Sequence, residues 1–103
     1  MAKLYVTEYS DVPSAYAAID MQLVREPPLV DQVPVAIGAG ALQSAAFSTM
    51  TKIVRLHTDV VCSFAIGPPA TTTATANNQR LAANATEFKL VIPGHVVSVI
   101  TNT

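Results

Sequence analysis

The candidates for a metal site or a catalytic nucleophile are four residues that lie near one another or near strand ends in the sequence: His57, Asp59, Cys62 and His95. A structural zinc site needs four ligands, usually in two closely spaced pairs such as Cys-x₂-Cys. His57 and Cys62 are five positions apart, and in one straight strand this odd spacing would direct their side chains to opposite faces. We therefore expect no metal ion and no cofactor, and we interpret Cys62 as a small core residue.

The acidic residues and glycines suggest no further site. Glycosidase-type chemistry needs a pair of carboxyl groups, but Glu8, Glu26 and Glu87 lie in polar or loop-flanking positions typical of solvated side chains. Gly38 and Gly40 are not followed by the Lys and Ser or Thr of a phosphate-binding loop. The sequence therefore predicts no catalytic residue, and we expect that the protein is not an enzyme.

The elements that position these residues are predicted to be β-strands, because apolar residues recur mostly with a period of two. Alternating runs occupy residues 3–7, 33–37, 53–57, 62–66 and 87–92. Residues 96–100 are almost continuously apolar and β-branched, which is typical of a strand covered on both faces. In the run at 87–92, the pattern predicts Phe88 on the core face, together with Leu90 and Ile92, and Glu87 on the opposite face.

Turn-forming residues separate these runs, notably at 27–28, 38–40, 67–69 and 93–94. Pro34 lies within an apparent strand and has no N–H group for a ladder, so that strand is predicted at a sheet edge. Short strands at regular spacing favour an all-β fold, a small β-sandwich or barrel, of which a jelly roll is one option. We expect one domain over residues 1–103, with a short loop or helical turn near 12–21, an extended arm at 1–8 and a long loop at 68–78.

The composition indicates a protein that contacts other subunits. Charged residues make up 13% of the chain, against about 25% in a typical soluble domain. We therefore expect a homo-oligomer, a dimer or trimer, because closed symmetric assemblies are the commonest. The net charge is −1 without a cluster of Lys or Arg, so nucleic acid is not an expected partner. No apolar stretch reaches the ~20 residues of a membrane span, so we expect no membrane association.

A set of strand and turn segments in a fixed order extends over nearly the whole chain: residues 2–9, 26–32, 44–47, 54–59, 62–67, 69–71, 81–83, 87 and 93–103. The order of these segments resembles that of a family of small structural proteins of tailed bacteriophages. The matching pieces are strands and turns without a chemical motif. The resemblance implies a virion protein made in the cytoplasm of the bacterial host.

Small β proteins of this kind commonly decorate the phage head, so the resemblance implies a cement protein that bridges subunits of the major capsid protein. Binding only to the assembled shell would stabilise the shell by mass action. Residues 25–28 could form an exposed polyproline-type segment, although a rigid turn is favoured. The residues expected at the partner interface are Lys3, Tyr5, Tyr9, Arg25, Glu26, Pro27, Pro28, Thr71, Thr73 and Asn77.

Three alternatives remain at this stage. The first is a tail or head–tail joining component of the virion. The second is a carbohydrate-binding β-sandwich module, which would usually expose aromatic rings, whereas this chain has no Trp and its three Tyr lie within the first sixteen residues. The third is a small hydrolase, for which the sequence offers no recognisable site.

Overall fold

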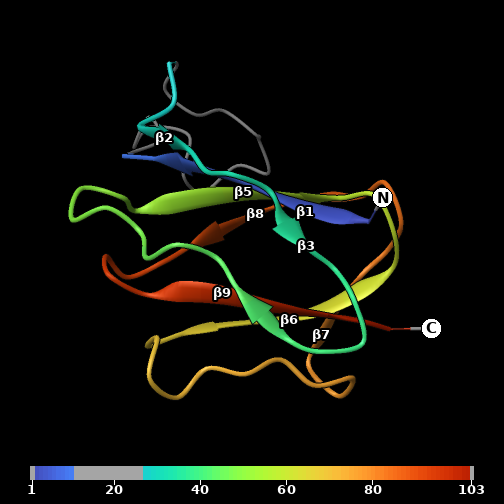
Figure 1. Cartoon of the computed structure of the whole chain (residues 1–103). Helices are drawn as coiled ribbons and strands as arrows, with labels where there is room; N and C mark the ends of the chain where they lie inside the picture. Colours follow the sequence, from blue (N-terminus) through green and yellow to red (C-terminus); the bar gives the residue numbers. More distant parts are fainter. Residues whose placement is uncertain (1, 11–26, 103) are drawn as a thin grey trace.

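The computed structural model describes residues 2–10 and 27–102 and consists of two antiparallel β-sheets packed face to face (Figure 1). Sheet A has the strand order β2-β1-β5-β8, with β3 also paired to β1, and sheet B has the order β4-β9-β6-β7. The strands are β1 Lys3–Tyr9, β2 Val30–Asp31, β3 Val35–Ala36, β4 Leu42–Gln43, β5 Ile53–Thr58, β6 Cys62–Gly67, β7 Gln79–Leu81, β8 Thr86–Leu90 and β9 Val96–Thr101. The predicted all-β sandwich is confirmed, and the helical turn expected near 12–21 lies outside the described residues.

From β3 onward the chain passes between the sheets at almost every connection. It runs from β3 in sheet A to β4 in sheet B, returns to β5 and crosses again to β6. Only β6 and β7 follow one another within one sheet, before β8 returns to sheet A and β9 to sheet B. Crossing connections of this kind are found in Greek-key and jelly-roll sandwiches.

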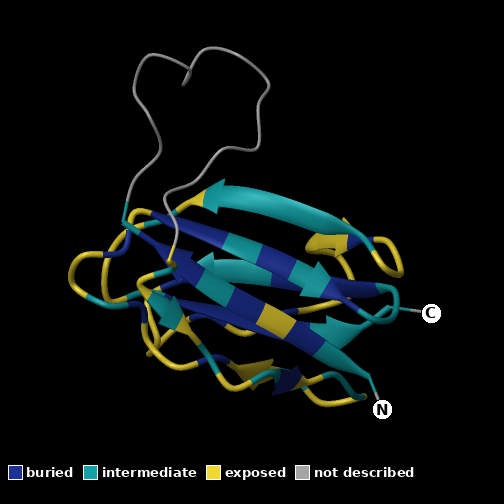
Figure 2. Cartoon of the chain, turned by 90° about the horizontal axis from the view of Figure 1, so that it is seen from above, coloured by how far each residue is buried: buried dark blue, intermediate teal, exposed yellow. Residues whose placement is uncertain are grey.

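The core lies between the two sheets and follows the predicted parity along the central strands. Val54 and Leu56 of β5 face Phe64 and Cys62 of β6, and all four side chains are fully buried. Along the central strands of sheet A, buried residues alternate with more exposed ones (Figure 2). The alternation of apolar residues in the sequence therefore correctly predicts which side chains of these strands face the core.

The expectation that residues 1–8 form an extended arm is wrong for the described part of that segment. β1 lies between β5 and the short strands β2 and β3, and it pairs with β5 over six positions from Leu4 to Tyr9. Leu4 and Val6 are 0% and 1% exposed and belong to the core. Burial of their apolar side chains stabilises the strand in the middle of sheet A.

The loop at 68–78 is present as predicted, but it lies against the outer face of sheet B. The amide of Ala74 donates to Ser98 Oγ at 2.9 Å, and Gln43 Nε2 of β4 donates to the carbonyl oxygens of Pro69 and Thr72 at 2.8 Å each. Val97 and Val99 face the core, whereas Val96 and Ser98 are buried on the other face. The prediction that this strand is covered on both faces is therefore confirmed.

The predicted orientation of β8 is wrong. In its antiparallel pairing with β5, Phe88 lies opposite Arg55, and Lys89 lies opposite the core residue Val54. Directly opposed residues share a face, so Lys89 and Glu87 point inward and Phe88 points outward. Leu90 is accordingly 82% exposed.

The described segments include no helix of the length and apolarity that a membrane span requires.

Candidate functional site

His57 lies on the outer face of sheet A, and Cys62 lies inside the sandwich. The His57 Nδ1 atom is 2.8 Å from Thr86 Oγ1, and its ring centroid is 6.1 Å from that of Tyr5. Because β5 ends at Thr58 and β6 begins at Cys62, the two side chains belong to strands of different sheets. The structure does not bring His57 and Cys62 together as a nucleophile and its base.

Cys62 is fully buried, which confirms its interpretation as a core residue. Burial raises the pKa of the Cys62 thiol, because a thiolate would lose its hydration, and a contact with Thr58 acts in the opposite direction. The sulfur donates to Thr58 Oγ1 at 3.7 Å. A protonated thiol away from solvent is a poor nucleophile.

Among the described residues, no group of three or more His, Cys, Asp or Glu side chains is arranged to hold a metal ion. His95 precedes β9 and is half-buried, and its amide donates to the carbonyl oxygen of Ile92 at 3.2 Å. Asp59 is half-buried in the turn after β5, and its amide donates to Lys3 at 3.2 Å. The four residues with metal-binding or nucleophilic chemistry thus occupy separate places in the fold.

Glu8 is buried, which corrects its interpretation as a solvated side chain. Its Oε1 atom accepts hydrogen bonds from the Ser48 amide at 2.8 Å and from Thr51 Oγ1 at 2.5 Å. Its Oε2 atom accepts from Gln32 Nε2 at 2.6 Å, and the same amide group also bonds to the backbone of Ala45. One carboxylate therefore connects β1 to two loops, an arrangement suited to holding the structure together.

The residues expected at the partner interface lie on opposite sides of the sandwich. Lys3 and Tyr5 are on the outer face of sheet A, where Tyr5 is 38% exposed. Thr71, Thr73 and Asn77 are exposed on the loop that covers sheet B. The two groups thus form two separate surfaces on opposite faces of the protein (Figure 1).

The remaining expected interface residues divide into three cases. Tyr9 is 4% exposed, so its side chain is buried in this structure, and its contact with a partner stays a prediction. Pro27 is exposed and Pro28 is half-buried, in the segment that leads into β2. Arg25 and Glu26 lie outside the described residues.

A groove that the sequence did not indicate opens between the β2–β3 segment and β4. Its volume is about 410 Å³, and its lining includes Val33, Pro34, Val35 and Leu42. Val33 is 86% exposed, although its spacing from Val35 predicted a shared buried face. Residues 32–34 interrupt the strand between β2 and β3, so the alternation of faces does not continue through them.

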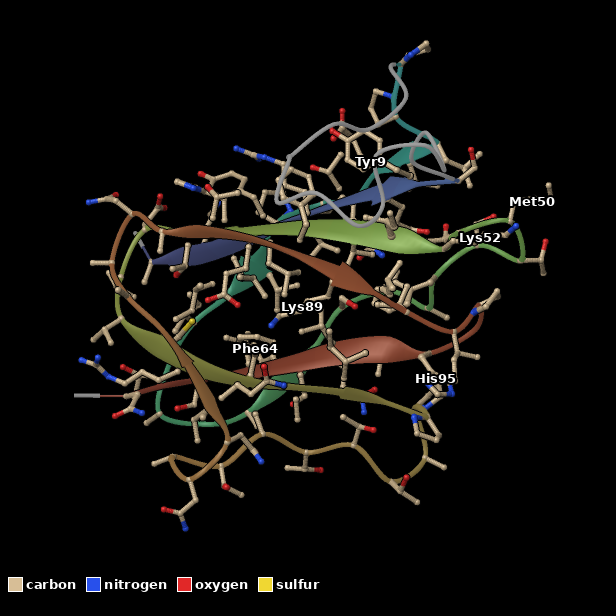
Figure 3. All side chains as sticks on the ribbon, turned by 180° about the vertical axis from the view of Figure 1, so that it is seen from behind. Tyr9, Met50, Lys52, Phe64, Lys89 and His95 are labelled. Atoms are coloured by element: carbon tan, nitrogen blue, oxygen red, sulfur yellow. The ribbon has the colours of Figure 1, made fainter. Side chains whose placement is uncertain are left out.

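A second set of exposed apolar residues lies where the 48–52 loop meets the β8–β9 connection. Met50 and Ile92 are 63% and 61% exposed, and Leu90 ends β8. The amide of Val91 donates to the carbonyl oxygen of Lys52 at 2.9 Å, which joins the two segments. Met50 and Lys52 lie side by side at this end (Figure 3). The apolar residues at 90–92 are visible in the sequence, but the period of two predicted Leu90 and Ile92 on the core face instead of at the surface.

Comparison with protein families, curated proteins and solved structures gives no match to this chain.

Proposed function

We propose that this protein is a structural component of a tailed-bacteriophage virion, and that it decorates the head by binding the major capsid protein. The observation that carries the proposal is the amount of apolar side chain at the surface. Val33, Leu42, Met50, Leu90 and Ile92 are each more than half exposed. Together with a charged fraction of 13%, this surface is typical of a protein that contacts other proteins.

The placement of the expected interface residues supports a bridging role. Tyr5 lies on the outer face of sheet A, and Thr73 lies on the loop over sheet B. A sandwich that uses both faces can contact two neighbouring capsid subunits with one copy. Selective binding to the assembled shell would then increase the stability of the shell with the concentration of free protein.

The proposal is tested by adding the purified protein to mature capsids that lack it. We expect co-sedimentation at a fixed ratio to the major capsid protein, and decorated capsids should resist heating better than undecorated ones. Recovery of the protein only in isolated tails would contradict the head assignment and favour the joining alternative. Absence from purified virions would contradict the virion role itself.

Two surface variants test the bridging geometry. If both faces contact capsid, Tyr5→Ala and Thr73→Ala should each weaken binding, and the double variant should bind more weakly than either. Ala39→Ser, at an exposed position in the turn between β3 and β4, is the matched control and should bind as the parent does. Binding that is unchanged in both single variants would show that neither face is used.

A further inference from the structure

The sandwich has four strand edges, and β8 is the one best suited to pair with another chain. Within the described residues, β8 pairs only with β5, and it is five residues long. The edges at β4 and β7 are two and three residues long. The remaining edge consists of the two-residue strands β2 and β3 with Pro34 between them. Short strands and proline protect an edge from pairing, and β8 has neither, although its inward-pointing Glu87 and Lys89 restrict which strands it can pair with.

The hydrogen bonds to β5 determine which backbone groups of β8 point to the open edge. The Thr58 amide donates to Ala85 at 3.2 Å, and the Val91 amide donates to Lys52 at 2.9 Å. In an antiparallel pair every second residue directs its N–H and C=O toward the neighbouring strand. Residues 85, 87, 89 and 91 therefore face β5. Thr86, Phe88 and Leu90 present their backbone groups to the open edge.

We propose that β8 pairs in antiparallel fashion with β8 of a second copy, around a two-fold axis at Phe88. In this register Phe88 lies opposite Phe88 of the second copy, and Thr86 lies opposite Leu90. All the outward backbone groups of β8 then find partners, because these three positions are the hydrogen-bonded ones. The two copies of sheet A would form one continuous sheet across the dimer.

The charges on β8 select this register. Glu87 and Lys89 flank Phe88 symmetrically, so the two-fold pairing places each Glu87 opposite a Lys89 of the other copy. A shift of two residues would instead oppose Lys89 to Lys89 or Glu87 to Glu87. Like charges directly opposite are unfavourable. A shift of one residue would place residues whose N–H and C=O groups face the open edge opposite residues whose groups face β5, so the hydrogen bonds between the copies could not form. Among the antiparallel registers near the strand centre, only the proposed one satisfies both conditions.

The side chains of β8 are available for this pairing. Lys89 Nζ lies 3.0 Å from Glu87 Oε1, and their side chains are 30% and 41% exposed, so either can turn to the second copy. On the outer face, pairing would place the two half-buried Phe88 rings side by side and cover part of Leu90. Cross-strand aromatic and opposite-charge pairs are both stabilising. The same charges disfavour pairing of β8 with unrelated strands, because such strands would not place opposite charges next to Glu87 and Lys89.

The first test uses charge reversal and sedimentation velocity. The parent should form dimers, whereas Glu87→Lys alone or Lys89→Glu alone should raise the dimer dissociation constant about tenfold, because each places like charges opposite one another. The exchange variant Glu87→Lys/Lys89→Glu should restore association. An equimolar mixture of the two single variants should form heterodimers, because every opposed pair in the mixed dimer has unlike charges.

The second test needs no variant, and it keeps the proposal testable if a charge reversal impairs folding. Hydrogen exchange followed by NMR should show the amides of Thr86, Phe88 and Leu90 gaining protection as protein concentration rises. The amides of Glu87 and Lys89, which face β5, should be protected at every concentration. A parent that remains monomeric, or a dimer that leaves the three outward amides unprotected, would overturn the proposal. So would single charge reversals that fold but associate as the parent does.

This dimer does not depend on the proposed virion role. A dimer that fails to bind capsids would contradict the proposed function alone. A monomer that binds capsids would contradict the pairing of β8 alone.

Discussion

The Nζ atom of Lys89 lies 5.7 Å from the centroid of the Phe64 ring, at the side of the sandwich bounded by β7 and β8 (Figure 3). The same nitrogen is 3.2 Å from Gln79 Oε1 and 3.0 Å from Glu87 Oε1. An ammonium group near an aromatic ring contributes about 0.5–1 kcal/mol when it is partly exposed. The polar cluster thus closes one side of the core over a fully buried ring.

Phe64 and Phe88 are predicted to differ in their contribution to stability. Phe64→Ala should lower the free energy of unfolding by about 3–5 kcal/mol, because it removes a large, fully buried ring from the core. Phe88→Ala should cost clearly less, since Phe88 lies on the outer face of sheet A and is only half-buried. Urea unfolding followed by circular dichroism measures both variants. An equal or larger loss for Phe88→Ala would contradict the inverted orientation of β8.

Strands in the middle of the sheets could be predicted from the sequence because their apolar periodicity and their burial coincide. Val54 and Leu56 face the core as their spacing indicates, as do Cys62 and Phe64. β8 differs because it lies at an edge, where a charged side chain can point inward and still reach solvent. Its orientation follows from its register with β5, which opposes Lys89 to Val54, and no local pattern contains that register.

The polar interactions were the least predictable part of the molecule. Glu8 binds groups from residues 24, 40 and 43 positions away in the sequence, so its burial depends on the complete fold. Of the expected interface residues, Tyr5 and Thr73 are at the surface, but they lie on opposite faces. Residue type could indicate solvent exposure, whereas the grouping of residues into one surface depends on the topology.

Glu8 is predicted to be essential for stability. Glu8→Ala should lower the free energy of unfolding by about 3 kcal/mol or more, because leaving a buried donor without an acceptor costs about 1–3 kcal/mol and this carboxylate serves several. Glu87→Ala is the matched control. In the monomer it removes a partly exposed carboxylate whose ion pair with Lys89 should contribute at most about 1 kcal/mol, so both variants are compared at protein concentrations too low for pairing of β8. Chemical denaturation of the two variants should therefore give very different midpoints, and similar midpoints would contradict a structural role for Glu8.

Cys62 is predicted to be unreactive in the folded protein and to make stability fall at alkaline pH. Burial raises the thiol pKa, so the folded state holds the proton more tightly than the unfolded state. The contribution of Cys62 to the free energy of unfolding is fully present below the thiol pKa of the unfolded state, about 8.5. It decreases as the pH rises above that value. A thiol-specific reagent should label the protein rapidly in denaturant and slowly without it. Rapid labelling of the native protein, or Cys62→Ala failing to reduce the alkaline loss of stability, would contradict this prediction.

Gly67 is predicted to be required for the docking of the loop at 68–78. A Cβ atom at Gly67 would lie 2.5 Å from Thr72 Oγ1, whereas a Cβ atom at Gly40 would meet nothing within 4 Å. Thr72 is buried, and its carbonyl oxygen accepts a hydrogen bond from Gln43, so the loop cannot move away without loss of contacts. Gly67→Ala should therefore destabilise the protein by about 1–3 kcal/mol, as expected for overpacking.

Gly40→Ala is the control for the loss of a glycine as such, and it should be neutral or slightly stabilising, because alanine restricts the unfolded chain. The variant Gly67→Ala/Thr72→Ala removes the opposing hydroxyl and so relieves the clash. Its loss of stability should therefore be no larger than the sum of the losses of the two single variants. Thermal unfolding measures all four variants. Hydrogen exchange at the Ala74 amide, which is bonded to Ser98 Oγ, reports whether the loop remains docked. If Gly67→Ala leaves both the melting temperature and this protection unchanged, the close approach of the loop to β6 is not what stabilises this face of sheet B.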